Sequence, residues 1–169
     1  MDMMVAQETN EMEICFDAIS SNESFARVAV AAFVTKVNPT LEEISDIKTA
    51  VSEAVTNAII HGYENFKGYE CPGKMLFGRE HHPGKVKVHC LLEGGMLHIE
   101  ISDNGKGIED VEQAMEPLFT TKPELERSGM GFAFMEAFMD DLEVESTPGL
   151  GTTVRMMKKM SAGAWIDEE

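Results

Sequence analysis

SEAVTNAIIH, residues 52–61, is the stretch that decides both the fold and the candidate site. It spaces Glu53, Asn57 and His61 four residues apart, so a carboxylate, an amide and an imidazole share one stripe of a helix. An amide oxygen is a suitable ligand for a hard cation such as Mg²⁺. A carboxylate one turn earlier could accept a proton from an attacking hydroxyl. A solvated polar helix face would show the same spacing, so further signals must decide.

The helix that contains this stretch has a clear beginning and a clear apolar face. Thr40 followed by Glu43 three residues later forms a capping box, which predicts that the helix starts at Thr40. It should end near Gly62. Its buried face is predicted from apolar residues at helical spacing, which are Ile44, Ile47, Val51, Val55 and Ile59.

A second helix is predicted upstream, from Glu23 to about Val37, with Asn22 as its cap and Asn38-Pro39 after its end. Its buried face is expected to hold Phe25, Val28, Ala29, Ala32 and Phe33. Two shorter helices are expected over residues 109–115 and from about 129–131 to 139.

The strands are predicted from alternating apolar residues between turns. They cover residues 11–19, 86–92, 96–102, 142–147 and 152–158, and the second and third form a hairpin across Glu93-Gly94-Gly95. Residues 63–84 are expected to be mostly loop, with one short strand around 74–79. Helices and strands interleaved in this way predict an α+β fold, a two-layer sandwich with a mixed, mainly antiparallel sheet.

The chain is expected to form one domain, residues 11–159, with an insertion at 66–84. A disordered segment, 1–10, and an acidic tail, 160–169, flank it. Its formal charge of −16 disfavours direct binding to nucleic acid. No apolar run approaches the roughly 20 residues that span a bilayer, and the polar N-terminus is unlike a signal peptide. A cytoplasmic location without membrane contact is therefore expected, with the three cysteines reduced.

A glycine-rich turn follows the predicted strand 96–102, in ISDNGKGI, residues 101–108. An ionised Asp103 only accepts hydrogen bonds, which suits an exocyclic amine such as that of adenine. Gly105 and Gly107 allow the backbone to approach a ligand closely. The alternative is an ordinary tight turn, since Asp-Asn-Gly is common turn chemistry.

A polar segment, PLFTTKPELERSGMGF at 117–132, combines donors with glycines that open a helix. Backbone N–H groups at a helix N-terminus, with cations nearby, favour an anion, and a break around Pro123 is typical of a lid. The alternative is a flexible surface loop. Its candidate ligand-binding residues are Thr120, Thr121, Lys122, Arg127, Ser128, Gly129, Met130 and Gly131. The chain has no P-loop, dinucleotide fingerprint or protein-kinase loop set.

Four short motifs, in this order, resemble those of the GHKL ATPase superfamily, which has the Bergerat fold. They are ExxxNAxxH at 53–61, DNGKG at 103–107, SGMGF at 128–132 and GTT at 151–153. Longer stretches of residues 11–159 resemble the sporulation anti-sigma F family, serine kinases of endospore-forming bacteria. The segment 66–84 departs from that family because it is longer than the usual link.

The resemblance implies ATP and Mg²⁺ as cofactors, with Glu53 as general base and Asn57 as Mg²⁺ ligand. Asp103 would select adenine together with Thr152 and the turn at Gly105 and Gly107. His61 would belong to the same nucleotide site. Lys122, Arg127 and the backbone at Gly129–Gly131 would surround the phosphates.

The resemblance also implies protein partners. These are a sigma factor of the sigma F type, an anti-anti-sigma protein phosphorylated on a serine, and a second copy of the chain in a homodimer. Glu23 and Arg27 match family positions that contact the sigma factor and the anti-anti-sigma protein. Two alternatives remain open, a stress-response anti-sigma kinase of the same family and a non-catalytic nucleotide-dependent binding module. Glu53 argues against the second, because a pure binder needs no general base.

Overall fold

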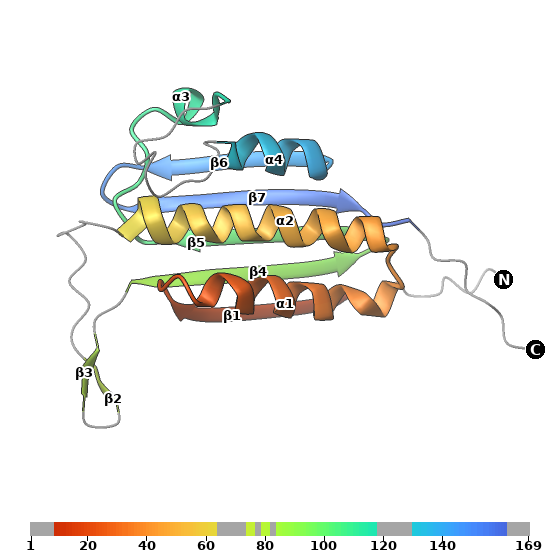
Figure 1. Cartoon of the computed structure of the whole chain (residues 1–169), viewed down its shortest axis with the longest axis horizontal. Coiled ribbons are helices and arrows are strands. Elements are labelled where there is room, and N and C mark those ends of the chain that lie inside the picture. The colour runs from red at the N-terminus through yellow and green to blue at the C-terminus, as the bar shows by residue number, and fades with distance from the viewer. Residues whose placement is uncertain (1–8, 64–73, 77–78, 82–83, 118–129, 162–169) are drawn as a thin grey trace, which may run out of the picture.

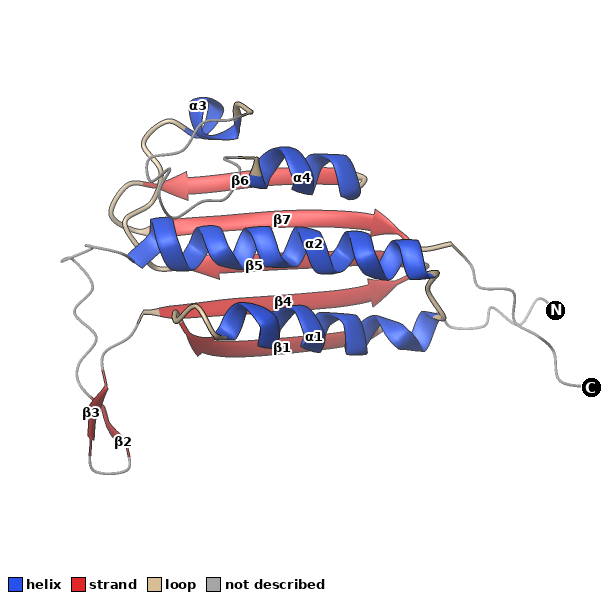
Figure 2. Ribbon diagram, in the orientation of Figure 1, coloured by secondary structure: helices blue, strands red, loops and turns tan. Residues whose placement is uncertain are grey.

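The computed structural model describes residues 9–63, 74–76, 79–81, 84–117 and 130–161. These residues form a five-stranded sheet covered on one face by helices, as Figures 1 and 2 show. The strand order is β1 (Asn10–Asp17), β4 (Lys85–Glu93), β5 (Met96–Asp103), β7 (Gly151–Lys159) and β6 (Asp141–Thr147). The covering helices are α1 (Asn22–Val34), α2 (Leu41–Asn57) and α4 (Gly131–Phe138). A short helix, α3 (Val111–Met115), follows β5.

This arrangement confirms the predicted α+β two-layer sandwich. Every strand pair in the described residues is antiparallel, whereas a partly mixed sheet was expected. The sheet face away from the helices carries cross-strand ion pairs, such as Arg155 with Glu100 at 2.8 Å. None of the described helices is long and apolar enough to cross a membrane.

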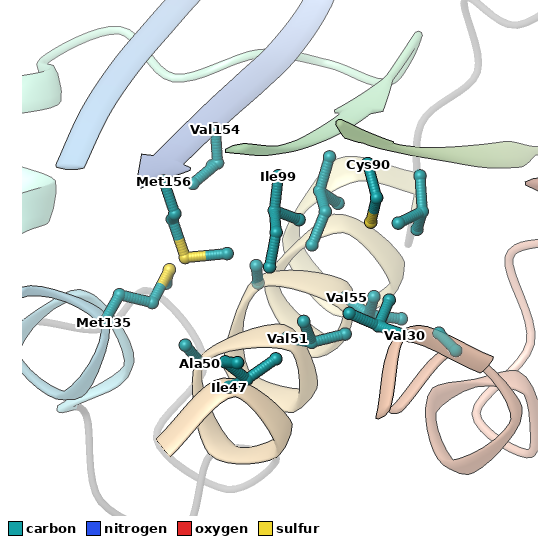
Figure 3. Close-up of a cluster of buried hydrophobic side chains, with 14 of the residues drawn as sticks. Val30, Ile47, Ala50, Val51, Val55, Cys90, Ile99, Met135, Val154 and Met156 are labelled. Carbon is teal, nitrogen blue, oxygen red and sulfur yellow. The ribbon is translucent and has the colours of Figure 1, made fainter. Parts of the chain in front are cut away.

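The core lies between the sheet and the helices, and Figure 3 shows its centre. Side chains from α1, α2 and α4 meet inward-facing residues of β4, β5 and β7 there. Along β5 every second residue is buried, in the order Leu97, Ile99, Ile101 and Asp103. Because side chains alternate between the two faces of a strand, Asp103 takes the place of a fourth apolar core residue. The layer therefore ends in a carboxylate.

Helix α2 begins as predicted and ends differently. Thr40 Oγ1 accepts a hydrogen bond from the Glu43 N–H at 3.1 Å, and Glu43 Oε2 accepts one from the Thr40 N–H at 2.7 Å, which confirms the capping box. The predicted apolar face is largely confirmed too, since Ile47, Val51 and Val55 are buried. After Asn57 the chain continues as a π-helical turn, Ala58–Tyr63. Such wider turns often occur at functional sites.

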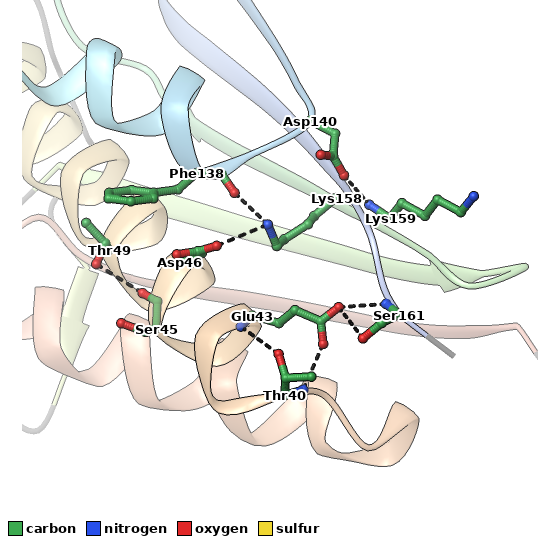
Figure 4. A network of polar contacts seen from close by, with 10 residues as sticks. All are labelled: Thr40, Glu43, Ser45, Asp46, Thr49, Phe138, Asp140, Lys158, Lys159 and Ser161. Carbon is green, nitrogen blue, oxygen red and sulfur yellow. Dashed lines mark hydrogen bonds and ion pairs between the residues drawn. The ribbon is translucent and has the colours of Figure 1, made fainter. Parts of the chain in front are cut away.

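Glu43 also links the start of α2 to Ser161, two residues after the end of β7 (Figure 4). Its Oε1 accepts hydrogen bonds from the Ser161 N–H at 2.6 Å and the Ser161 hydroxyl at 2.7 Å. Burial alone would raise the pKa of Glu43, but the hydrogen bonds from Ser161 and Thr40 outweigh it and lower the pKa. Nearby, Lys158 Nζ donates to the Phe138 carbonyl at 2.7 Å and pairs with Asp46 at 3.3 Å, which ties α4 and β7 to α2.

The buried face predicted for α1 is only partly right: Phe33 packs against the core, but the centre of the buried face lies elsewhere. Ala26, Val30 and Val34 are buried, whereas Phe25 and Val28 are 52% and 60% exposed. Asn22 is also no cap: it is the first helical residue, and its amide donates to the Asp17 carbonyl at 2.9 Å. The α-helix ends at Val34 and continues as a 3-10 turn, Thr35–Val37.

Between α2 and β4 the structure has two short strands where one was expected. β2 (Lys74–Leu76) and β3 (Arg79–His81) pair with each other as an antiparallel ribbon and not with the main sheet. Figure 1 shows this ribbon away from the two layers. The two described cysteines, Cys15 and Cys90, are free thiols.

Candidate functional site

A cavity of about 560 Å³ opens between α2, the end of β5, α3, α4 and the β6–β7 turn. That volume is typical of a small-molecule site. Residues from all four sequence motifs line it, although they come from distant parts of the chain. These lining residues are Asn57, His61, Asp103, Gly107, Gly131 and Thr152. The structure therefore brings the predicted motifs together at one place.

Asp103 is the buried charge of this cavity, with only 8% of its surface exposed. Burial raises its pKa from 3.8 to about 6, although hydrogen bonds from the backbone of Gly105 and Thr152 act in the opposite direction. The Gly105 N–H donates to Asp103 Oδ1 at 2.8 Å. A buried carboxyl group with a raised pKa that lines a cavity is typical of a functional site.

The glycine-rich turn after Asp103 packs directly against the end of the π-helical turn. The Lys106 N–H donates to the Gly62 carbonyl at 2.8 Å. A Cβ added at Gly105 would lie 2.1 Å from that same carbonyl oxygen, so no other residue fits there without displacing backbone. This contact fixes the position of Asp103 relative to α2.

We therefore expect Gly105→Ala to weaken nucleotide binding as well as stability. Its crowding against backbone should lower the free energy of unfolding by about 1–3 kcal/mol. Gly95→Ala is the matched control, because Gly95 has a φ of +77° but no atom within 4 Å of an added Cβ. It should cost about 1–2 kcal/mol through strain and leave nucleotide affinity unchanged. Denaturant unfolding with calorimetric ATP titration measures both; equal ATP affinity in the two variants would contradict the packing argument.

Glu53 and Asn57 lie side by side where α2 meets the first residue of α4. A Cβ added at Gly131 would be 3.2 Å from Glu53 Oε2 and from Asn57 Nδ2, and 3.4 Å from Asn57 Oδ1. Gly131 thus allows the N-terminus of α4 to approach both polar groups closely. Asn57 lines the cavity, and Glu53 stands beside it one turn earlier. A carboxylate and an amide oxygen here could serve a proton transfer and a cation.

The sequence analysis missed Ser146, which organises the β6–β7 end of the site. Its hydroxyl accepts from the Ile108 N–H at 2.8 Å and donates to the Gly151 carbonyl at 3.1 Å. It also contacts Thr152 Oγ1 at 2.8 Å. A small hydroxyl residue at the end of an edge strand gives no distinctive signal in the sequence. Thr152, which was predicted, is thereby held toward the cavity.

The apolar wall of the cavity was also missed, because its residues are ordinary core residues in the sequence. It combines strand and helix side chains with small residues of α2 and of the π-helical turn, a surface suited to a flat ring. These residues are Ala54, Ala58, Ile101, Ile108, Phe132 and Val154.

The remaining predicted residues are not at the cavity or lie outside the description. Met130 is the half-buried residue that precedes α4. Thr120, Thr121, Lys122, Arg127, Ser128 and Gly129 lie outside the described residues. Glu23 and Arg27 lie on α1, where they form an ion pair at 3.5 Å. Neither lines the cavity.

Comparison with known proteins gives results consistent with this geometry. Residues 20–158 match the family described as "Histidine kinase-like ATPase domain". The chain is 53% identical over 152 residues to the anti-sigma F factor of Bacillus subtilis, a match that covers 90% of this chain and 94% of that protein. It is 56% identical over 150 residues to the anti-sigma F factor of a Thermoanaerobacter species, which covers 89% and 94% of the two chains.

Two solved structures resemble the fold. The crystal structure of the RsbU and RsbW domains of a Mycobacterium tuberculosis protein matches 92% of this chain and 33% of its own, with a TM-score of 0.60 and 20% identity. The catalytic domain of the histidine kinase ThkA matches 90% of this chain and 96% of its own, with a TM-score of 0.50 and 15% identity. At these identities the likeness concerns the fold alone.

Proposed function

This chain belongs to the anti-sigma F factor family and carries a histidine kinase-like ATPase domain, and on that premise we propose that it is an ATP-dependent protein serine kinase. It would hold a sigma factor of the sigma F type inactive in the cytoplasm. The chain would also phosphorylate a serine of the anti-anti-sigma protein, which competes with the sigma factor for binding to this chain. The observation that carries the proposal is the buried Asp103, which lines one cavity with Asn57. Glu53 lies beside Asn57, one turn earlier on α2.

The cavity supports ATP as the nucleotide. Asp103 would accept a hydrogen bond from the adenine amine, and the apolar wall, with Ile101 and Val154, would hold the ring. The phosphates would extend toward Gly131, where backbone N–H groups open α4. His61 and Thr152 would contribute polar contacts, and the segment 120–129 would complete the phosphate site.

Glu53 would be the general base that accepts the proton of the attacking serine hydroxyl. Mg²⁺ would neutralise phosphate charge, and Asn57 would supply one of its oxygen ligands. Phosphoryl transfer depends mostly on positioning and on such neutralisation. The proximity of Glu53 and Asn57 to Gly131 supports this assignment, because it brings both polar side chains to the N-terminus of α4, toward which the phosphates would extend.

Helix α1 would provide the surface for the protein partners. Arg27 has 38% of its side chain exposed and is paired only loosely with Glu23, at 3.5 Å. The exposed apolar side chains of Ile19, Phe25 and Val28 lie on the same segment. Apolar side chains together with an arginine are typical of interface centres. The unexpected exposure of Phe25 and Val28 therefore supports the assignment.

Arg27→Ala should lower affinity for both the sigma factor and the anti-anti-sigma protein, by roughly 1–3 kcal/mol for an interface anchor. ATP affinity should stay unchanged, since Arg27 does not line the cavity. Surface-binding measurements with each partner and a nucleotide titration test this. Lys36→Ala, another cation of this region, is the control. Normal binding of both partners by Arg27→Ala would place the recognition surface elsewhere.

The proposed activity itself is tested by incubating the protein with labelled ATP and the anti-anti-sigma protein of the same organism. Label should appear on a serine of that protein. Binding of ATP without transfer would instead indicate a non-catalytic binding module.

Sedimentation of the same protein would test the proposed homodimer. Expression of a fragment of residues 11–159 would test the proposed domain limits.

A further inference from the structure

Tyr63, the last residue of the π-helical turn, links that turn to the start of β4 and to the glycine-rich turn after Asp103. Its own side chain does not line the cavity. Its hydroxyl donates to the Lys85 carbonyl at the start of β4, at 2.5 Å. The same oxygen accepts a hydrogen bond from the Asn104 N–H at 2.8 Å. Its ring packs against Gly84, where an added Cβ would lie 2.3 Å from a ring carbon. No described motif of the nucleotide site includes this residue.

We propose that Tyr63 is a positioning residue for nucleotide recognition. It holds the turn 103–107 in the geometry that presents the Asp103 carboxylate to the adenine ring. The proposal rests on the proposed function, since it takes Asp103 as the hydrogen-bond acceptor for adenine. It concerns a side chain that would not touch the nucleotide and would act through the turn.

The hydrogen bonds along the turn carry this inference. Three successive backbone N–H groups are fixed by different acceptors: Asn104 by the Tyr63 hydroxyl, Gly105 by Asp103 Oδ1, and Lys106 by the Gly62 carbonyl. Two of the three acceptors belong to Gly62 and Tyr63, at the end of the π-helical turn that continues α2. The helix that carries Glu53 and Asn57 therefore also sets the position of the turn that carries the adenine acceptor.

Loss of the Tyr63 hydroxyl would release the first of these three groups. The Asn104 N–H would lose its acceptor, and the neighbouring Gly105 N–H would be held less firmly toward Asp103. Because that hydrogen bond lowers the pKa of Asp103 against the effect of burial, its weakening would raise the pKa further. The other ionisable side chains around the cavity, which are His61, Lys106, Glu109, Asp110 and Glu116, are unchanged by the substitution.

The test compares Tyr63→Phe with the wild-type chain. Phenylalanine keeps the ring against Gly84 and removes only the hydroxyl. We expect ATP affinity at pH 8 to fall about five- to tenfold, the effect of one lost hydrogen bond, with reduced preference for ATP over GTP. The pKa of Asp103, followed by carboxyl carbon NMR in the nucleotide-free protein, should rise above that of the wild type. A merely structural role would lower the melting temperature without this shift.

Ser161→Ala is the matched control, because it removes a hydroxyl hydrogen bond, to Glu43, at the opposite end of α2. It should change neither ATP affinity nor the pKa of Asp103. Wild-type ATP affinity and an unchanged Asp103 pKa in Tyr63→Phe would overturn the proposal. Failure of the wild-type chain to bind ATP would refute the proposed function instead, and the NMR comparison would still decide whether Tyr63 positions the turn.

Discussion

Glu53→Gln is expected to slow phosphoryl transfer strongly while ATP still binds. Glutamine has nearly the same shape as glutamate and should fit beside Gly131. A Cβ added at Gly131 would lie 3.2 Å from Glu53 Oε2. It cannot accept the proton of the serine hydroxyl, so transfer should slow by about 10²–10⁴-fold, the usual contribution of a general base. Single-turnover transfer from labelled ATP, with calorimetric titration of ATP, separates the two effects.

The comparison variant is Asn57→Ala, on the same face of α2 one turn later. It should weaken Mg²⁺-dependent ATP binding, because it removes the proposed oxygen ligand. Glu53→Gln should therefore lower mainly the rate of transfer, whereas Asn57→Ala should lower mainly the affinity for ATP in the presence of Mg²⁺. Near-normal transfer by Glu53→Gln would exclude Glu53 as the base, and an unchanged Mg²⁺ dependence in Asn57→Ala would exclude Asn57 as the ligand.

Asp103→Asn should lose nucleotide affinity and gain stability. An amide that turns its N–H groups toward the adenine amine replaces attraction by repulsion, so we expect ATP to bind about 10–100-fold more weakly, the effect of a lost charged hydrogen bond. The preference for ATP over GTP should fall with it. Titration with both nucleotides at pH 8, where Asp103 is ionised, measures this loss. An unchanged base preference would count against the assignment.

The stability gain follows from the pKa of Asp103, which is about 6 in the folded chain and 3.8 as the reference value. Between these values the folded chain binds more protons than the unfolded chain, so the free energy of unfolding falls as pH rises from about 4 to 6. Above pH 6 the ionised carboxylate costs about 3 kcal/mol. Asparagine removes this cost but leaves one N–H donor unpaired, so a net gain of about 1–2 kcal/mol is expected at pH 8. Thermal unfolding should show little gain at pH 4; equal effects at both values would refute the titration argument.

The structure brings residues of all four predicted motifs to one cavity, whereas much of what surrounds that cavity was not predicted. Glu53, Asn57 and Asp103 could be located because each polar residue interrupts or flanks an apolar period, and that period is set by local backbone geometry. The capping box at Thr40 is equally local, and the structure confirms it. The order of motifs then supplied the fold class, which the antiparallel sheet and its helical layer bear out.

What was missed depends on contacts between distant segments. The apolar residues of α1 allowed more than one buried face, and only packing on β1, β4 and α2 selects Ala26 and Val30 over Phe25 and Val28. The π-helical turn has no sequence signature, because Gly62 reads equally well as a simple helix end. The role of Ser146 requires three partners from other positions, which no period in one strand reveals.

The contact between Tyr63 and Gly84 makes the chain between them a natural site for variation and for engineering. Both ends of that segment are anchored in the core at neighbouring points, so its length is independent of the register of β4. The entropy of closing such a loop grows only slowly with its length, about 0.6 kcal/mol for each doubling. The length of this stretch could therefore change in evolution without disturbing the sheet and helices that form the cavity. A fluorescent reporter inserted after Tyr63 would be joined through the backbone to the residue whose hydroxyl contacts Asn104 in the turn beside the cavity.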